Sequence, residues 1–232
     1  CFSKRGKDMG ICDWPEDERP REKLLTRGAA SLSDAELLAL FLRTGIKGLS
    51  AVGLAKRALA QFGSLSALIH APLQAFADIP GLGPAKYAQL AATVELTRRA
   101  LAEDLHTGDV LSNPDSVRNY LRLLLARREI EVFLVLFLSN QNRVLAVEEV
   151  AHGTINQTAV YPREIARHAL KHHATAVIVA HNHPSGAREP SEADRALTKR
   201  LVAALQLLDI RLLDHFIVAG TATVSFAEEG WL

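Results

Sequence analysis

The feature that most constrains the fold is a pair of short, uninterrupted apolar runs in the second half of the chain. Residues 131–138 read EVFLVLFL and residues 174–180 read ATAVIVA. Runs of this length and composition fit buried β-strands. The segment RVLAVEEV follows the first run after the turn SNQN, and we expect it to form an antiparallel hairpin with that strand.

Helical patterns alternate with the strands in this half. The sequence predicts helices over residues 113–127, 162–173 and 192–208, and two closing strands over residues 210–220 and 223–228. Pro162 fits the first turn of its helix, because no N–H donor is needed there. The second half is therefore predicted to be α+β.

The first half of the chain, by contrast, carries no strand signal. From Arg19 to about Leu101, leucines and alanines recur at three- and four-residue spacing, which indicates consecutive helices. Ser33 and Glu36 fit a capping box at one helix start, and Gly45 fits the stop of that helix. This half is predicted to be an all-helical module.

A polar stretch, AEDLHTGD, separates the two patterns. We therefore divide the chain into a flexible leader (residues 1–18), a helical domain (19–101), a linker (102–109) and an α+β domain (110–232). Hydrophobic residues make up 48% of the chain, which is enough for a real core in each domain.

One turn in the helical half has a more specific pattern. In DIPGLGPAK, Gly81 and Gly83 fit a tight turn, and Pro84 opens a helix that is predicted to end at Ala100. The segment resembles a helix-hairpin-helix motif, which would hold DNA phosphates at the start of its second helix, with Lys86 nearby. The same glycines equally fit a turn that only lets two helices pack closely.

Net charge and cysteine content limit which partners and which cellular compartment we expect. With 27 Lys+Arg against 26 Asp+Glu, no overall basic field indicates nucleic-acid binding, although a local basic patch is compatible with it. The two cysteines, Cys1 and Cys12, are too few for a disulfide framework. No stretch approaches the roughly 18 apolar residues that span a bilayer. We expect a cytoplasmic protein without a membrane segment.

The segment AVIVAHNHPSGAREPSEAD, residues 176–194, contains the candidate metal ligands. Alternate side chains share one face of a strand, so His181 and His183 can converge where the strand ends at Pro184. Ten residues separate His183 from Asp194, which falls in the first turn of the next helix. Two histidines and one carboxylate make a three-ligand zinc set that leaves the fourth position for water.

A capping box is the competing interpretation. Ser191 and Asp194 fit the S-x-x-[DE] pattern, in which Asp194 folds back on the Ser191 amide and binds nothing else. A pair of histidines in a loop would then be merely solvated. The joint spacing of the histidines, the serine and the aspartate favours a metal site over a capping box alone.

These four residues match the JAMM motif, H-x-H-x7-S-x2-D, of the JAB/MPN metalloproteases. The segments YPREI, AHNHPSG, EPSEAD and LLDHFIV resemble the bacterial RadC family more closely, and the resemblance covers most of the chain. It implies a JAB/MPN (cytidine-deaminase-like) mixed β-sheet domain flanked by helices, with zinc held by His181, His183 and Asp194. Asn182 stands where deubiquitinases of the family usually carry Ser or Thr, which weakens any transfer of ubiquitin specificity.

The resemblance also implies a catalytic glutamate at the start of a strand upstream of the histidines, and Glu131 holds that place. Glu131 would take a proton from the zinc-bound water and pass it to the leaving amine, while Ser191 would donate to the oxyanion. Four other glutamates compete for the role: Glu129, Glu148, Glu149 and Glu164. The implied function is a zinc metallopeptidase acting on a peptide or isopeptide bond of an unidentified protein or peptide.

Other histidines have simpler interpretations. His168 and His172 are four apart on a helix, a spacing that can bind zinc, but the glutamate of an H-E-x-x-H site is missing, so a solvated helix face is favoured. His215 fits either a partner of the site or a satisfied core histidine, and the core is favoured.

A second function comes from a different class. The hairpin segment, and the historical description of RadC-like proteins as repair factors, suggest a DNA-binding or DNA-repair accessory protein. In that function the metal would be structural or absent.

Overall fold

The computed structural model describes residues 14–153 and 160–232. Contacts divide the described chain into two compact units, one up to Leu96 and one from Thr97 onward. Of the predicted leader, residues 1–13 lie outside the described residues. Trp14 packs against the core of the helical unit, and Glu16–Glu18 form a short 3-10 helix, η2.

The described elements of the N-terminal unit are helices, as the sequence predicts, apart from a single β-bridge between Ile46 and Leu49. Before α6 the unit contains α1 (Pro20–Arg27), the 3-10 helix η3 (Ala29–Ser31), α2 (Asp34–Leu42), α3 (Ala51–Phe62), α4 (Leu65–Ile69) and α5 (Leu73–Ala77). Ser33, Ser50 and Ser64 start three of these helices, because each hydroxyl accepts a hydrogen bond from the amide three residues on. The predicted capping box between Ser33 and Glu36 is present.

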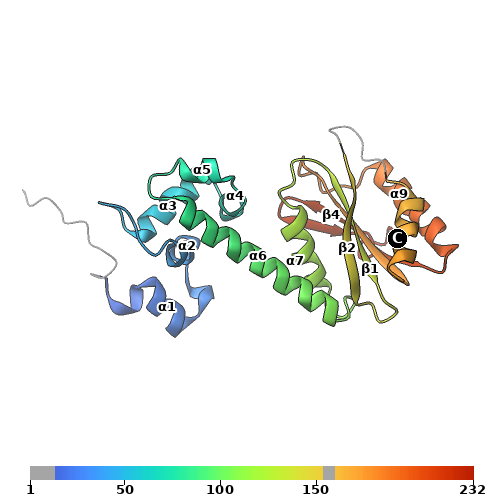
Figure 1. The fold of residues 1–232 in the computed structure, drawn as a ribbon, viewed down its shortest axis with the longest axis horizontal. Coiled ribbons are helices and arrows are strands. Elements are labelled where there is room, and N and C mark those ends of the chain that lie inside the picture. The colour runs from blue at the N-terminus through green and yellow to red at the C-terminus, as the bar shows by residue number, and fades with distance from the viewer. Residues whose placement is uncertain (1–13, 154–159) are drawn as a thin grey trace, which may run out of the picture. The chain divides into compact units, whose positions relative to one another are not determined.

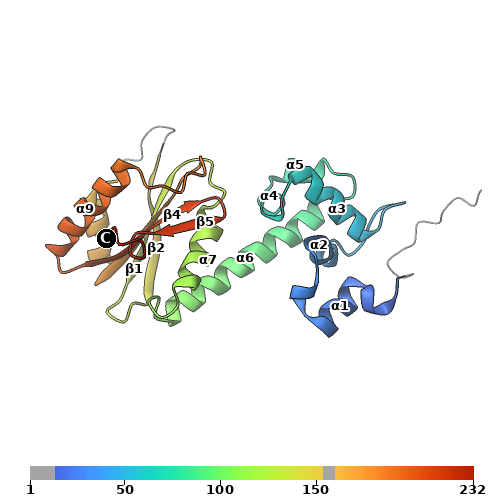
Figure 2. The ribbon, with the colours of Figure 1, turned by 180° about the vertical axis from the view of Figure 1, so that it is seen from behind.

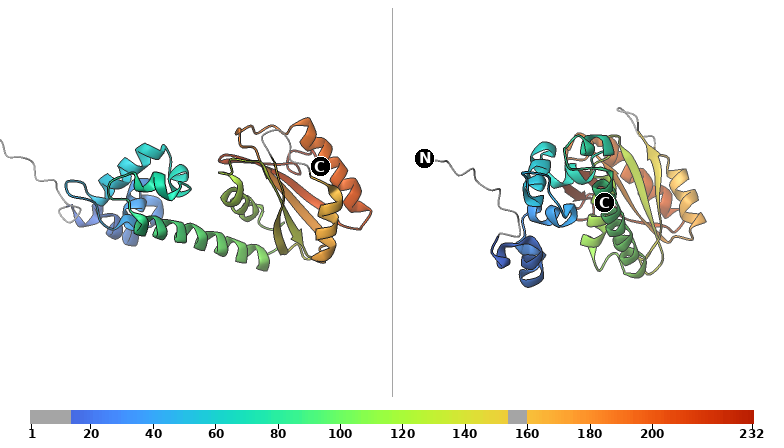
Figure 3. Two further views of the ribbon diagram at one scale, coloured as in Figure 1. Left: turned by 45° about the horizontal axis from the view of Figure 1, so that its top comes forward. Right: turned by 60° about the vertical axis from the view of Figure 1, so that its left-hand side comes forward.

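One hydrophobic core joins the helices from α2 onward. Buried side chains from α2, α3, α4 and α5 meet there, together with Ile79 and Leu82 from the turn before α6. Figure 3 shows the short helices gathered around the first half of α6 (Pro84–Thr107). The unit is therefore held by apolar burial, since most of its helices are too short to be stable alone.

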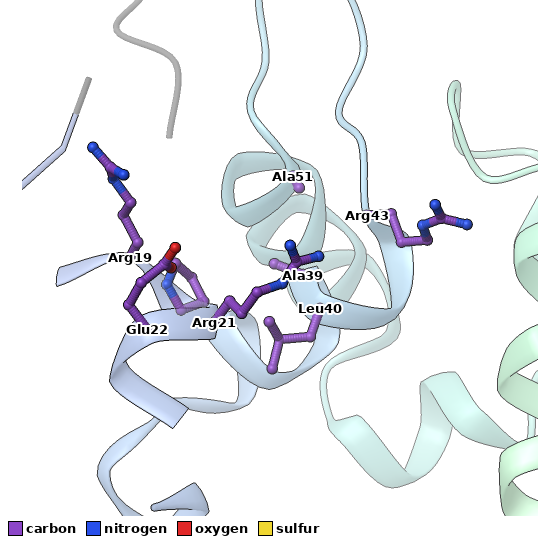
Figure 4. A pocket seen from close by; sticks show the side chains of 8 residues that line it. Arg19, Arg21, Glu22, Ala39, Leu40, Arg43 and Ala51 are labelled. Carbon is purple, nitrogen blue, oxygen red and sulfur yellow. The ribbon is translucent and has the colours of Figure 1, made fainter. Parts of the chain in front are cut away.

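A cavity of about 260 Å³ lies beside α1 and α2 in this unit (Figure 4). Arg19, Arg21 and Arg43 contribute to its lining, and Arg43 ends α2 with a φ of 59°, which L-residues rarely adopt. In Figure 4 the Arg19 and Arg43 side chains point away from each other. The cavity therefore does not gather the three guanidinium groups around one point.

The C-terminal unit is built on a five-stranded mixed sheet (Figures 1 and 2). Its strands are β1 (Val132–Leu138), β2 (Val144–His152), β3 (Ala176–Asn182), β4 (Arg211–Ala219) and β5 (Ala222–Ser225). The order across the sheet is β2-β1-β3-β4-β5, with β3 and β4 parallel and the other neighbours antiparallel. The two apolar runs form β1 and β3, which lie inside the sheet and are buried along their whole length.

Helices cover both faces of this sheet. α7 (Pro114–Leu125) packs on one face, and α8 (Pro162–Lys171) and α9 (Glu192–Gln206) pack on the other. In Figure 1, α7 and α9 lie on opposite sides of the strands. Because alternate residues of a strand point to opposite faces, β1 and β3 contribute to both cores. The predicted mixed sheet flanked by helices is confirmed.

The helix α6 continues beyond its predicted end at Ala100. It runs to Thr107, so residues 102–107 of the predicted linker are helical. Leu105 is buried in the core that α7 covers, and Leu101 packs against the same core. The polar letters around these two leucines concealed an apolar i, i+4 pair. Although α6 has 24 residues, neither it nor another helix of the described residues has the apolar length to cross a bilayer.

Candidate metal centre

The predicted ligand residues meet at the end of β3. His181 and Asn182 are the last two residues of this strand, and the amide of His183 still donates to the Val218 carbonyl on β4, 3.0 Å away. Strand alternation therefore continues through His183, which brings both imidazoles to one side of the sheet. The His181 ring is buried and stacks on the Phe133 ring, with their centroids 6.0 Å apart.

Asp194 reaches both histidines from the first turn of α9. Its Oδ1 lies 3.2 Å from His181 Nε2, and its Oδ2 lies 3.4 Å from His183 Nε2. The two Nε2 atoms are 3.0 Å apart. One ligand atom from each residue lies within 4.8 Å of the other two, and this spacing suits ligands placed about 2 Å from one central ion.

The predicted capping box is also present at this position. Ser191 Oγ accepts from the Asp194 amide at 3.1 Å and donates to Asp194 Oδ2 at 2.6 Å, and the Ser191 amide donates to the same oxygen at 2.8 Å. The cap binds Oδ2, while Oδ1 faces His181. The two interpretations of the sequence are therefore compatible, because the cap holds the carboxylate against the imidazoles.

Hydrogen bonds around the imidazoles show whether their lone pairs suit a metal. His183 Nδ1 lies 2.7 Å from the Ala187 carbonyl. A carbonyl only accepts, so Nδ1 carries a proton, and Nε2 keeps its lone pair when the ring is neutral. Two facing Nε2 atoms beside a carboxylate require a shared proton or cation. The donor set therefore fits a divalent metal ion.

The three groups also shift one another's pKa values. Burial opposes ionisation of Asp194, but its interactions with His181 and His183 and the hydrogen bond from Ser191 hold the pKa of its carboxyl well below the ordinary value. The hydrogen bond with Asp194 raises the pKa of His183 despite burial, and the charge of Glu131 acts in the same direction. The cluster thus stabilises positive charge at the point where the ligand atoms meet.

A third histidine lies behind His181. The His215 ring on β4 is fully buried, and it is hydrogen-bonded to His181 Nδ1 at 2.9 Å and to Thr198 Oγ1 at 2.7 Å. Burial holds the pKa of His215 well below its ordinary value, which favours the neutral form of the ring. His215 is both a core histidine and a partner of the site, whereas the sequence favoured the core interpretation alone.

Comparison with known sequences identifies the family. The family model described as RadC-like JAB domain matches residues 111–231, more than half of the chain. The chain belongs to the RadC family. A second family model, UPF0758 N-terminal, matches residues 11–88 of this RadC-family chain. The resemblance predicted from AHNHPSG and LLDHFIV is confirmed.

Relatives of this RadC-family chain are similar over nearly its whole length. A UPF0758 protein of Chromobacterium violaceum is 64% identical over 224 residues, which cover 97% of this chain and 100% of that protein. A UPF0758 protein of Thiobacillus denitrificans is 60% identical with the same coverage. A third, of Nitrosomonas europaea, is 56% identical over 96% of this chain and 99% of that protein.

The segment before β1 carries the predicted catalytic glutamate. Glu131 lines a cavity of about 430 Å³ together with His183 and Ser191, and Glu129 and Glu189 line the same cavity. Among the described residues, none of these three glutamates makes an ion pair with Lys or Arg. In the part of the chain that the structure describes, the charge of these glutamates is therefore not offset by a salt bridge to a basic side chain.

Asn182 fastens this segment to β3, a role the sequence did not predict. Its buried amide donates to the carbonyls of Arg128 and Ile130, and its Oδ1 accepts from the Val132 amide at 2.8 Å. Asn182 thereby spans from the strand that carries His181 to the residues on both sides of Glu131.

Three of the four glutamates that competed with Glu131 pair with basic side chains elsewhere in the RadC-family chain. His168 and His172 both hydrogen-bond to Glu148, Arg128 pairs with Glu149, and Arg167 pairs with Glu164. The prediction of a solvated helix face for His168 and His172, which lie on α8 and at its C-cap, was wrong, because both rings are mostly buried between Glu148 and Phe137.

The glycine turn before α6 serves packing within the helical unit. Gly81 has a φ of +95°, and a Cβ there would lie 2.4 Å from Ile46 Cγ2. The Lys86 ammonium donates to the carbonyls of Thr44 and Gly81, at 2.8 and 2.9 Å, and burial lowers its pKa. Around Gly83, by contrast, a Cβ would meet open space. Gly81 and Lys86 are thus explained by internal contacts, and Gly83 is not.

Proposed function

We propose that this chain is a zinc-dependent metallopeptidase of the JAMM type that hydrolyses peptide or isopeptide bonds. The observation that carries the proposal is the convergence of His181 Nε2, His183 Nε2 and the Asp194 carboxylate, within 4.8 Å, in a RadC-like JAB domain. These three residues would hold the metal and leave one side open for water. When bound, zinc would supply the Lewis acidity that lowers the pKa of a water molecule and polarises an amide carbonyl.

Glu131 is the proposed general base. It would accept a proton from the attacking water and deliver it to the leaving amine, which needs a carboxylate that no cation neutralises. Support comes from its place on the cavity that His183 and Ser191 also line, and from the effect of its charge on the pKa of His183. Glu129 lines the same cavity and is the remaining competitor.

Ser191 is the proposed donor to the carbonyl oxygen of the substrate. Its hydroxyl already donates to a negatively charged oxygen, Oδ2 of Asp194, at 2.6 Å. Substrate binding would turn this O–H toward the oxygen on which negative charge develops. The Asp194 oxygen would keep the hydrogen bond from the Ser191 amide.

Paired substitutions test this function. We expect purified protein to hold about one zinc per chain, and Glu131→Gln to retain the zinc while hydrolysis of peptide or isopeptide substrates falls by about 10²–10⁴-fold. Glu129→Gln is the matched control and should stay active. Unchanged zinc affinity in Asp194→Asn would contradict the metal site, and loss of activity in Glu129→Gln alone would transfer the role of base to Glu129.

DNA binding by the helical unit is a second candidate, supported by the open space around Gly83 at the start of α6. An exposed backbone at a helix start is the type of surface that holds a phosphate. Affinity for duplex DNA should then fall steeply with salt and weaken in Gly83→Pro. Lys86→Ala tests whether the Lys86 ammonium, which donates to two main-chain carbonyls, also contributes to DNA affinity. Binding that neither salt nor Gly83→Pro changes would overturn this candidate.

A further inference from the structure

We propose that Thr198 and His215 form a hydrogen-bond relay that fixes the tautomer of His181 and so keeps its Nε2 lone pair available for the metal. The inference rests on the proposed function only in taking His181 as a metal ligand. The relay lies in the buried interface between α9, β4 and β3, away from the cavity.

The direction of the relay follows from its last member, a main-chain carbonyl. Thr198 Oγ1 lies 2.7 Å from the Asp194 carbonyl and 2.7 Å from His215 Nδ1. Because a carbonyl has no proton to give, the single hydroxyl proton of Thr198 is committed to Asp194. The Thr198 oxygen must then accept from His215, so Nδ1 of His215 carries the proton.

The same reasoning identifies the donor in the hydrogen bond between His215 and His181. A neutral imidazole with a protonated Nδ1 has a lone pair on Nε2, so His215 Nε2 is an acceptor. The atom 2.9 Å away, His181 Nδ1, must therefore be the donor. Neutral His181 then has its lone pair on Nε2, the atom that faces His183 and Asp194.

His183 and His181 both keep the lone pair on Nε2, but different hydrogen-bond partners hold them in this tautomer. His183 donates directly to a carbonyl, that of Ala187, and a carbonyl can only accept. His181 donates to another ring, which by itself could point either way. Only the Thr198 hydroxyl removes the ambiguity. Reversing the relay would leave the Asp194 carbonyl without the Thr198 proton and place a proton on His181 Nε2.

The decisive comparison is Thr198→Val against Thr198→Ser. Valine has nearly the shape of threonine but offers no acceptor to His215, whereas serine keeps the hydroxyl. Long-range ¹H–¹⁵N correlation spectra of the imidazoles, recorded on metal-free protein at about pH 8, report which nitrogen of His181 is protonated. Competition with a chelator gives the zinc affinity of each variant.

We expect wild type and Thr198→Ser to show His181 protonated at Nδ1. Thr198→Val should show a population protonated at Nε2, and its zinc affinity should be about 10–100-fold weaker. A Thr198→Val protein with the wild-type tautomer and wild-type affinity would overturn the relay.

A second pair keeps the test valid if the valine variant folds poorly. A glutamine at position 215 can accept from His181 through its oxygen and donate to Thr198 through its nitrogen, and leucine can do neither. His215→Gln should therefore retain more zinc affinity than His215→Leu, and equal affinities would count against the relay. If wild type binds no zinc, the proposed function fails, while the imidazole spectra still decide the relay.

Discussion

The side-chain amide of Asn182 donates to the main-chain carbonyl of Ile130 across 3.0 Å. Two further hydrogen bonds, to Arg128 and from Val132, make this buried side chain the link between β3 and the segment that carries Glu131. The residue between the two histidines thus holds the segment that supplies the proposed base. One stretch of strand thereby positions the two histidines of the candidate metal site and the proposed base.

Asn182→Ser should separate catalysis from metal binding. Serine is too short to reach all three backbone groups, so we expect a loss of about 2–4 kcal/mol in the free energy of unfolding. Zinc affinity should stay within about twofold, while hydrolysis should fall by about 10–100-fold as Glu131 loses its position. Chelator competition and kcat measure the two effects. A parallel loss of affinity and activity would show that Asn182 supports the ligands instead.

Ser191→Ala should weaken both the cap of α9 and the hold on Asp194. Loss of the cap costs about 1 kcal/mol in the free energy of unfolding. Because Asp194 then loses the hydroxyl that orients it, zinc affinity should fall by about tenfold. Ser33→Ala is the matched control, since it removes the same type of capping box from α2. An equal effect of both substitutions on zinc affinity would contradict the prediction.

Gly81→Ala should destabilise the helical unit, and Gly83→Ala should not. A Cβ at residue 81 meets Ile46 in a backbone conformation that favours glycine, which we expect to cost about 1–3 kcal/mol. Residue 83 has room for a methyl group and a φ outside the left-handed region. Urea unfolding of both variants gives the comparison. Equal stability would mean that the turn before α6 can relax around a side chain.

The helical unit should lose stability in acid through Glu36. Hydrogen bonds from the Ser33 amide and from Lys23 lower the pKa of Glu36 to about 2, from 4.5. Because the folded-state pKa is the lower one, this stabilisation is complete above about pH 4.5 and is lost as the pH falls toward 2. Glu36→Gln should therefore be less stable near neutrality and less sensitive to acid across this range.

Tryptophan fluorescence can follow that unit separately. In a Trp231→Phe background the remaining tryptophan is Trp14, which packs against the helical core. Urea unfolding at several pH values between 2 and 7 then gives the free energy of unfolding of the helical unit as a function of pH. Asp34→Asn, which removes a charge from the same helical turn and leaves the capping box intact, should keep the acid sensitivity. If Glu36→Gln and Asp34→Asn change the acid sensitivity equally, the loss of stability in acid comes from the general charge of the helix and not from the capping box.

Local patterns were sufficient to predict much of the fold. The apolar runs of β1 and β3, and the capping boxes at Ser33 and Ser191, are each visible in a few neighbouring residues. Spacing likewise predicted that His181, His183 and Asp194 would meet, since a strand and the first turn of the next helix fix their directions.

The parts that the sequence did not predict depend on pairings between distant segments. Parallel pairing aligns Val179 with His215, and only that register brings the His215 ring beside His181 on the same face of the sheet. The reach of Asn182 to Ile130 likewise requires the antiparallel pairing of β1 with β3. The end of α6 was missed because Leu105 finds its apolar partners on other elements.

The position of the candidate ligands along the chain has a mechanical consequence. His183 precedes the exposed loop of residues 184–189, and Asp194 follows it on α9. An ion bound by both would act as a removable cross-link across this loop and restrict its conformations, as loop closure does. Cleavage after Arg188 by trypsin would then become slower on metal loading. The loop itself would report whether the site is filled, before any substrate is known.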